Sequence, residues 1–284
     1  DDQRVNVTAV DLDQSASLDL SADAASNVGE WSNYPVTSIR RLVRNFPGEL
    51  AGLDLAFSGD LPRASGMSSS SAVVIATAMA LIYRNDLSQR REYEKNIRSP
   101  EDLAGYLASI ENGSSFGTLQ GQRGVGTFGG SEDHTAILCG RRDELSQYSY
   151  CPVRLERRIL LPEEMTFVIA SSGVEADKTG AARENYNQAS ALASSVVRAW
   201  NRATQRRDAH IADAIHSSPD AVDKMRRILP ESDLEEAPPE ALVKRFEHFY
   251  AESEEILPTP GEALLGGDLL EAPGPSDRPQ PLAG

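Results

Sequence analysis

A loop of mostly small residues joins a strand-like segment to a strongly apolar one, and this combination restricts the fold more than any other feature. Residues 53–57 (Leu-Asp-Leu-Ala-Phe) alternate between apolar and other side chains, which predicts a strand. Residues 72–83 are almost entirely apolar and predict a buried helix. The connecting residues 66–71 read Gly-Met-Ser-Ser-Ser-Ser. A helix of this kind needs a sizeable core around it, and the order predicts a mixed helix and strand fold.

The rest of the chain also mixes the two patterns, without a strict strand–helix–strand repeat. The predicted strands are at 4–10, 17–20, 135–139 and 165–171. The predicted helices are at 31–45, 99–111, 180–207 and within 239–257. This order favours the α+β class over a doubly wound sheet. The proline-rich sequence from Pro258 onward is expected to be poorly ordered.

Length and charge limit the number of domains and the kinds of partner that the chain can have. The chain has 284 residues, enough for one large domain or two moderate ones with a real core. It carries 28 lysines and arginines against 43 aspartates and glutamates, a formal net charge of −15. This acidic balance argues against a nucleic-acid partner, since binding the phosphate backbone needs a positive face. A local basic pocket for an anionic ligand is still compatible with it.

The number of cysteines and the length of the apolar stretches indicate the cellular compartment. Cys139 and Cys151 are too few for a disulfide framework and are expected to be free thiols in a reducing compartment. The longest apolar stretch, 72–83, is shorter than the ~20 residues that cross a bilayer. The first residues carry no signal peptide or lipidation motif. We therefore expect a cytoplasmic protein with no membrane partner.

Residues 66–72 have the properties of an anion-binding loop. Small side chains let an anion approach the backbone, and the first N–H groups of a helix lack partners within that helix. Four consecutive hydroxyls can donate to phosphate oxygens or bind Mg²⁺. The residues alone leave open a simpler alternative, in which the serines cap a helix at a corner. The segment is neither a Walker A loop nor a hydrolase nucleophile elbow.

A second loop, 113–130, is rich in glycine and serine and leads to Asp133. Residues 124–129 match G-x-G-x-x-G, but a dinucleotide fingerprint should follow a strand and open a helix, and neither is predicted here. Asp133 suits a general base for a substrate hydroxyl, or alternatively a turn carboxylate that bonds its own backbone. Successive side chains on a strand point to opposite faces, so residues 132–134 do not favour a transition-metal site.

Several short segments carry more information together than singly, because they occur in a consistent order. They are residues 31–34 (Trp-Ser-Asn-Tyr), 61–72 (ending Gly-Met-Ser-Ser-Ser-Ser-Ala), 111–112 (Glu-Asn), 129–134 (Gly-Gly-Ser-Glu-Asp-His), 171–174 with 186–187 (Tyr-Asn), and 252–258 with 267–269. Together they resemble the GHMP kinase superfamily, and most closely its galactokinase branch.

The resemblance implies a two-lobed α+β fold. Residues 1–160 would form the N-terminal, ATP-binding lobe (ribosomal protein S5 domain 2-like), 161–270 part of a ferredoxin-like C-terminal lobe, and 271–284 a poorly ordered tail. The resemblance also implies the site residues. ATP would contact Gly66, Met67, Ser68, Ser69, Ser70, Ser71 and Ala72, with Trp31 near the adenine. Mg²⁺ would be held by Ser69, Ser70 and Glu111. The catalytic base would be Asp133, and the sugar would contact Asp133 and Tyr186.

The chain also departs from the family pattern. The family's first motif, G-R-V-N-L-I-G-E-H-x-D-Y, would precede Asp1, and its third, G-A-G-x-G-G, would follow Gly284. We therefore expect a fragment that is incomplete at both ends. His134 stands where the family has glutamine, Gly129-Gly130 replaces Cys-Gly, and extra residues lengthen the loop before Asp133.

The activity that the resemblance implies is transfer of the γ-phosphoryl group of ATP to a monosaccharide hydroxyl, in the first place the anomeric one. The partners would be a small-molecule sugar and ATP, bound by a monomer or homodimer. Galactose, N-acetylgalactosamine, arabinose and uronic acids stay open as substrates. Three alternatives stay open as well: an inactive sugar and ATP sensor on the same fold, an inactive fragment, and a structural module without a ligand. The presence of Asp133 and Glu111 favours an enzyme.

Overall fold

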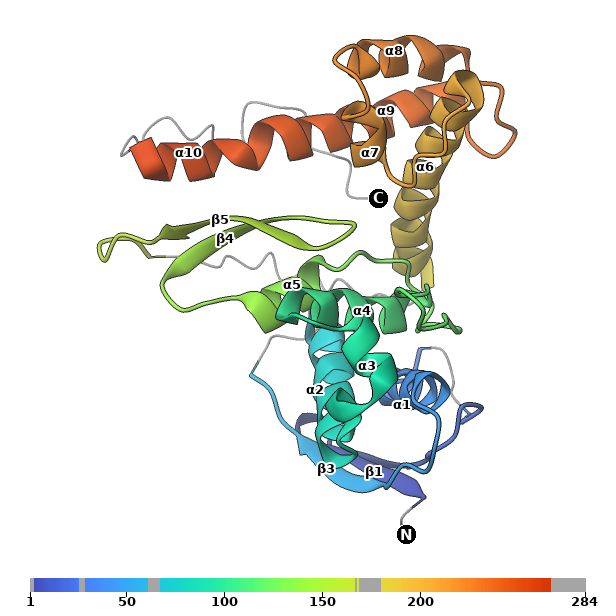
Figure 1. Cartoon of the computed structure of the whole chain (residues 1–284), viewed down its shortest axis with the longest axis vertical. Coiled ribbons are helices and arrows are strands. Elements are labelled where there is room, and N and C mark those ends of the chain that lie inside the picture. Colours follow the sequence, from blue (N-terminus) through green and yellow to red (C-terminus); the bar gives the residue numbers. More distant parts are fainter. Residues whose placement is uncertain (1–2, 26–28, 61–66, 167, 169–179, 267–284) are drawn as a thin grey trace. The chain divides into compact units, whose positions relative to one another are not determined.

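The computed structural model describes residues 3–25, 29–60, 67–166, 168 and 180–266 (Figure 1). The chain divides into two compact units, residues 1–183 and 184–284, and each is described by itself. Helices and short antiparallel and parallel strand pairs occur together, so the α+β class is confirmed. The described part of the chain contains no helix long and apolar enough to cross a membrane.

A three-stranded sheet opens the first unit. The central strand β1 (Arg4–Ala9) pairs antiparallel with β2 (Gln14–Asp19) and parallel with β3 (Leu53–Phe57). Val5 and Val7 are fully buried, whereas Asn6 between them donates to the Asp54 carboxylate on the opposite, polar face. The period-two alternation therefore produces one core face and one solvated face. The strands predicted at 4–10, 17–20 and 53–57 are confirmed.

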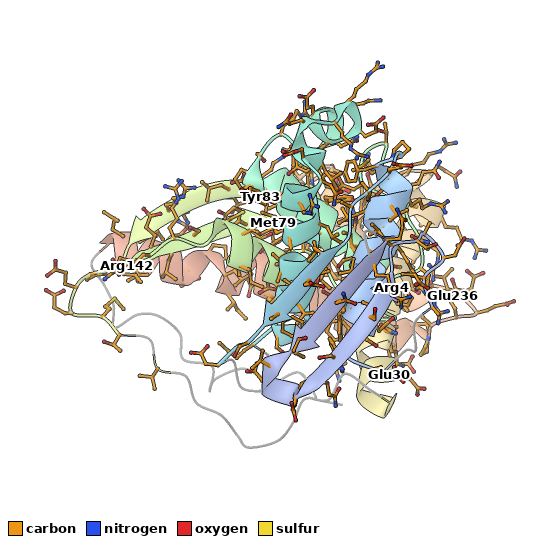
Figure 2. The ribbon with its side chains drawn as sticks, turned by 90° about the horizontal axis from the view of Figure 1, so that it is seen from below. Arg4, Glu30, Met79, Tyr83, Arg142 and Glu236 are labelled. Atoms are coloured by element: carbon orange, nitrogen blue, oxygen red, sulfur yellow. The ribbon has the colours of Figure 1, made fainter. Side chains whose placement is uncertain are left out.

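Helices α1 (Asn33–Asn45), α2 (Ser69–Arg84) and α4 (Pro100–Asn112) pack together with the buried face of this sheet. The fully buried members of this core are Val5, Val7, Ile39, Leu42, Phe46, Val74, Ala78, Leu81, Leu87, Tyr106 and Leu107. Short helices η1 (Val10–Leu12), η2 (Leu87–Gln89) and α3 (Arg91–Asn96) complete the connections. The outer side of α2 carries Met79 and Tyr83, which are one turn apart and exposed (Figure 2).

The start of α4 shows how local sequence sets a helix boundary. The Ser99 hydroxyl accepts a hydrogen bond from the Asp102 N–H at 3.1 Å, and Pro100 takes the first helical position, where its missing N–H costs nothing. Gly113 ends the helix with φ of +86°, a left-handed conformation that glycine adopts without strain. The helix predicted at 99–111 is confirmed.

The strand predicted at 135–139 is wrong, because these residues belong to helix α5 (Glu132–Cys139). A run of five mostly apolar residues fits both a buried strand and a short buried helix, so the sequence pattern cannot tell them apart. The acidic pair Glu132 and Asp133 occupies the first turn, where negative charge is favourable, and Thr135 Oγ1 donates to Ser131 O at 2.7 Å. Because α5 follows loop 113–130, the G-x-G-x-x-G segment does precede a helix. It follows α4 and a loop, not a strand, so a dinucleotide fingerprint is still disfavoured.

A hairpin that the sequence patterns did not predict follows α5. Strands β4 (Glu144–Ser149) and β5 (Arg154–Leu160) pair antiparallel with an irregular register between Gln147 and Tyr148. Of the strand predicted at 165–171, Met165, Thr166 and Val168 belong to no strand, and the remaining residues lie outside the described ones.

In the described residues of the second unit, helices joined by loops are the regular secondary structure. Its elements are α6 (Gly180–Thr204), α7 (Ile211–Ile215), α8 (Ala221–Ile228), η3 (Leu229–Glu231), α9 (Pro239–Tyr250), the π-helical turn η4 (Ala251–Ile256) and α10 (Pro258–Gly266). The Trp200 side chain is buried in the core of this unit, and its Nε1 donates to Asp208 Oδ2 at 2.8 Å. Helices predicted within 180–207 and 239–257 are confirmed.

Disorder was expected from Pro258 onward, and for residues 258–266 this expectation is wrong. They form α10. Pro258 and Pro260 both lie in its first turn, where a proline removes no intrahelical hydrogen bond. Residues 267–284, which include the predicted tail 271–284, lie outside the described residues.

Candidate functional site

Three oxygen-bearing side chains from three helices meet in the first unit. Ser71 comes from the first turn of α2, Glu111 from the last turn of α4 and Asp133 from the first turn of α5. Ser71 Oγ donates to Glu111 Oε2 at 2.9 Å and lies 3.5 Å from Asp133 Oδ2. A hydroxyl has one proton, so Ser71 donates to one carboxylate at a time. These residues define the Ser71–Glu111–Asp133 cluster.

The cluster is largely shielded from water. Ser71 is 1% exposed and Glu111 is 8% exposed, whereas Asp133 is half-buried. Alone, a glutamate in the last turn of a helix would be expected to reach solvent. Burying its negative charge beside a second carboxylate costs free energy, unless hydrogen-bond donors or a cation offset that cost. Asp133 next to it keeps part of its surface accessible to solvent.

His134 is the fourth polar group at this position. It is 2% exposed, and its Nε2 lies 3.4 Å from Glu111 Oε2. The strand geometry that argued against a metal at 132–134 does not apply, because α5 turns successive residues by about 100°. Glu132 is accordingly exposed, Asp133 half-buried and His134 buried. Among the described residues, no group of three or more His, Cys, Asp or Glu side chains could hold a metal ion.

The start of α2 is marked by an unusual backbone conformation. Ser68 immediately before it has φ of +56°, a conformation that non-glycine residues rarely adopt, and this residue turns the chain into the helix. Ala72 N donates to Ser68 O at 3.0 Å. The N–H groups of residues 69–71 therefore precede the first intrahelical bond and are available to an anion at the positive end of the helix. Gly66 lies outside the described residues.

Among the described serines 68–71, Ser71 is the one whose hydroxyl bonds the carboxylates. Ser69 and Ser70, expected to bind Mg²⁺, are half-buried on the same helical turn, and Ser71 makes the contact with Glu111. Side chains on consecutive helical positions point about 100° apart, so Ser69 and Ser70 point in other directions than Ser71. Metal binding by Ser69 and Ser70 stays a prediction.

Trp31 and Tyr186 belong to other elements than the cluster. The Trp31 ring packs edge-on against Phe57 of β3, with centroids 6.0 Å apart and planes at 73°. This contact makes Trp31 part of the first core, and its role near adenine stays a prediction. Tyr186 lies on α6 in the second unit and is 43% exposed. The segment 171–174, predicted to accompany it, lies outside the described residues.

The donor set of the cluster fits Mg²⁺. A hydroxyl and two carboxylates are hard oxygen ligands, and Mg²⁺ commonly uses one or two protein carboxylates together with substrate phosphates and water. Its charge would also offset the two carboxylates that Ser71 alone cannot both satisfy. The adjacent helix start fits the phosphates of a nucleotide.

Comparison with known proteins bears on the same region. Residues 33–121 match the family model of the GHMP kinases N terminal domain. The galactokinase of Saccharomyces cerevisiae is 29% identical over 174 residues, and that of Dictyostelium discoideum is 25% identical over 182 residues. Residues 33–121 are thus similar to the GHMP kinases N terminal domain, and a larger part of the chain is similar to galactokinases.

The matches cover only part of each relative. They cover 57% and 63% of the chain but only 30% and 32% of the yeast and Dictyostelium proteins. A galactokinase of Haemophilus influenzae is 33% identical over 76 residues, or 27% of the chain and 20% of that protein. The chain thus spans about a third of the length of the relatives it matches. The family match includes Ser71 and Glu111 and ends before Asp133.

Proposed function

We propose that this galactokinase-like chain carries the phosphate-binding and catalytic groups of an ATP-dependent sugar kinase. The reaction is transfer of the γ-phosphoryl group of ATP to a monosaccharide hydroxyl, namely the anomeric one. The observation that supports it is the convergence of Ser71, Glu111 and Asp133 beside the start of α2. Phosphoryl transfer depends on positioning and charge stabilisation, and this arrangement supplies groups for both.

Each group has a role in the proposal. The N–H groups at the start of α2 bind the β- and γ-phosphates, and Ser69, Ser70 and Glu111 hold Mg²⁺ together with Ser71. When bound, Mg²⁺ neutralises charge on the phosphates. The Asp133 carboxylate accepts or orients the proton of the attacking hydroxyl. Trp31 lies near the adenine and Tyr186 reaches the sugar.

The wider setting is also part of the proposal. Residues 1–160 and 161–270 belong to the two lobes of a GHMP kinase, with 271–284 as a tail. The protein works in the cytoplasm as a monomer or homodimer on a small sugar and ATP, with neither nucleic acid nor membrane as partner.

Replacing Ser71 with alanine should raise the Mg²⁺ concentration needed for half-maximal turnover by about 10-fold, because the hydroxyl that orients Glu111 is lost. Ser69→Ala, two residues earlier in the same helical turn, should weaken the use of MgATP by a smaller factor. Titrating Mg²⁺ at saturating ATP measures both. A larger effect in Ser69→Ala would assign the contact with Mg²⁺ to Ser69 and not to Ser71.

The proposed function is tested by measuring ADP release from MgATP with a panel of sugars: galactose, N-acetylgalactosamine, arabinose and galacturonate. Turnover with one of them, dependent on Mg²⁺, is the expected result in the complete protein. A sensor on the same fold would show a thermal shift with MgATP and sugar but no ADP release. A structural module would show neither, and either outcome would reject the kinase assignment.

A further inference from the structure

One row of side chains on α1 is polar although it is buried. Asn33, Thr37, Arg41 and Asn45 follow one another at intervals of four residues and are between 1% and 6% exposed. Residues at this spacing lie on one face of a helix. A helix usually buries apolar side chains on such a face, because buried polar groups cost free energy unless they are hydrogen-bonded. We call these four residues the polar row.

Three members of the polar row donate to backbone carbonyls of loop 113–130. The bonds are Arg41 Nη2 to Ser114 O at 2.7 Å, Asn45 Nδ2 to Gln120 O at 3.1 Å, and Asn33 Nδ2 to Val125 O at 3.0 Å. The acceptors are spread from the start of the loop to its second half. The fourth member, Thr37, donates within α1 to Asn33 O at 2.7 Å and, among the described residues, has no hydrogen bond to the loop.

Arg41 shows that the row does not serve stability alone. It is 1% exposed, and burial lowers the pKa of its guanidinium. Besides the loop carbonyl it bonds Asn45 Oδ1 at 2.7 Å and Ser109 Oγ at 3.0 Å, and it lies 5.7 Å from the centre of the Tyr106 ring. Within the described part of the chain no carboxylate forms an ion pair with it, and its Nη1 has no hydrogen-bond partner. A buried cation without an acidic partner is a net cost to folding.

The loop that the polar row holds connects the two carboxylates of the site. It begins directly after Glu111 and Asn112 at the end of α4, and it ends directly before α5, which carries Asp133. Val125 N donates to Glu111 O at 2.8 Å, so the residue bound by Asn33 is itself bonded to the backbone of Glu111. Asn112 Nδ2 donates to Gly129 O at 2.9 Å and closes the loop at its far end.

We propose that the polar row is a positioning device for the site: Asn33, Arg41 and Asn45 hold loop 113–130 in the one conformation that brings Glu111 and Asp133 together at Ser71. In the described part of the chain, the side-chain hydrogen bonds of these three residues go to α1, α4 and the loop, so they are positioning residues. The effect on turnover rests on the proposed kinase function. The effect on the loop does not, because it follows from the hydrogen bonds alone.

The test compares Asn33→Leu with Thr37→Val in the complete protein. Both remove a polar group from the same face of α1 with nearly the same side-chain size, but only Asn33→Leu removes a bond to the loop. We expect the Val125 amide to exchange with solvent hydrogen about 10-fold faster in Asn33→Leu than in wild type, and to be unchanged in Thr37→Val. The kcat of Asn33→Leu should fall by about 10-fold with KM for ATP within about threefold, since a displaced catalytic group impairs the transition state more than binding.

A second variant addresses the case in which Asn33→Leu fails to fold. Arg41→Lys keeps the charge but cannot reproduce the planar fork that bonds Asn45, Ser109 and Ser114 together. It should show the same faster exchange in the loop and the same fall in kcat. Equal loop exchange in Asn33→Leu, Arg41→Lys and Thr37→Val would overturn the inference. Faster loop exchange with unchanged kcat would overturn it as well. A wild-type protein without any turnover would reject the kinase function. In that case the hydrogen-exchange comparison alone would decide whether the polar row holds the loop.

Discussion

Asp133→Asn should lower kcat for sugar phosphorylation by about 10²–10⁴-fold, the usual contribution of a positioned general base. Asparagine keeps the shape of the side chain and can still accept a bond from Ser71, but it cannot take a proton from the substrate. Binding of MgATP should change by less than about threefold, because the phosphates contact the start of α2. Single-turnover kinetics with the preferred sugar, together with nucleotide titration, separate the two effects.

Glu132→Gln is the matched control for Asp133→Asn. It removes one negative charge from the same first turn of α5, but the Glu132 side chain is exposed. It should leave kcat near the wild-type value. Near-normal turnover in Asp133→Asn, or an equal loss in both variants, would reject Asp133 as the base.

Glu111→Gln should lower kcat/KM for MgATP by about 100-fold at millimolar Mg²⁺, with partial recovery as Mg²⁺ is raised. The amide oxygen can still accept the bond from Ser71 Oγ, so the local packing is retained. The charge that would attract the metal is lost. Mg²⁺ titration of the initial rate at several fixed ATP concentrations measures the change.

The matching control is Glu94→Gln, which removes an exposed carboxylate from α3. It should not alter the Mg²⁺ requirement. Thermal unfolding of both variants checks that Glu111→Gln has not simply reduced the folded fraction. An unchanged Mg²⁺ dependence in a stably folded Glu111→Gln protein would remove Glu111 from the proposed metal site.

Elements with strong local signals were predictable from the sequence, and those without them were not. The cap at Ser99, the alternation in 4–10 and the apolar run after Ser71 each led to a confirmed element. β4 and β5 were missed because most of their residues are polar or partly exposed, so no period-two burial pattern marks them. Helix α5 was mistaken for a strand because its apolar run is too short to show a period.

The sequence by itself determined which chemical groups are available to the candidate site. The serine run before an apolar helix, the glutamate at a helix end and the aspartate after a glycine-rich loop are local features, and their order along the chain carries the family resemblance. The anion-binding character of the start of α2 is also local, because any helix start exposes unpaired N–H groups.

Only the tertiary structure decided which of these groups meet. That Ser71 and not Ser69 or Ser70 contacts Glu111 depends on the rotation of α2 about its axis against α4, and the packing of the core sets this rotation. The polar row on α1 likewise acquires its partners only when loop 113–130 folds over it, across separations of more than 70 residues. Local propensity acts over a few neighbours, whereas these contacts come from burying three helices and a sheet in one core, and no local pattern specifies how they are rotated.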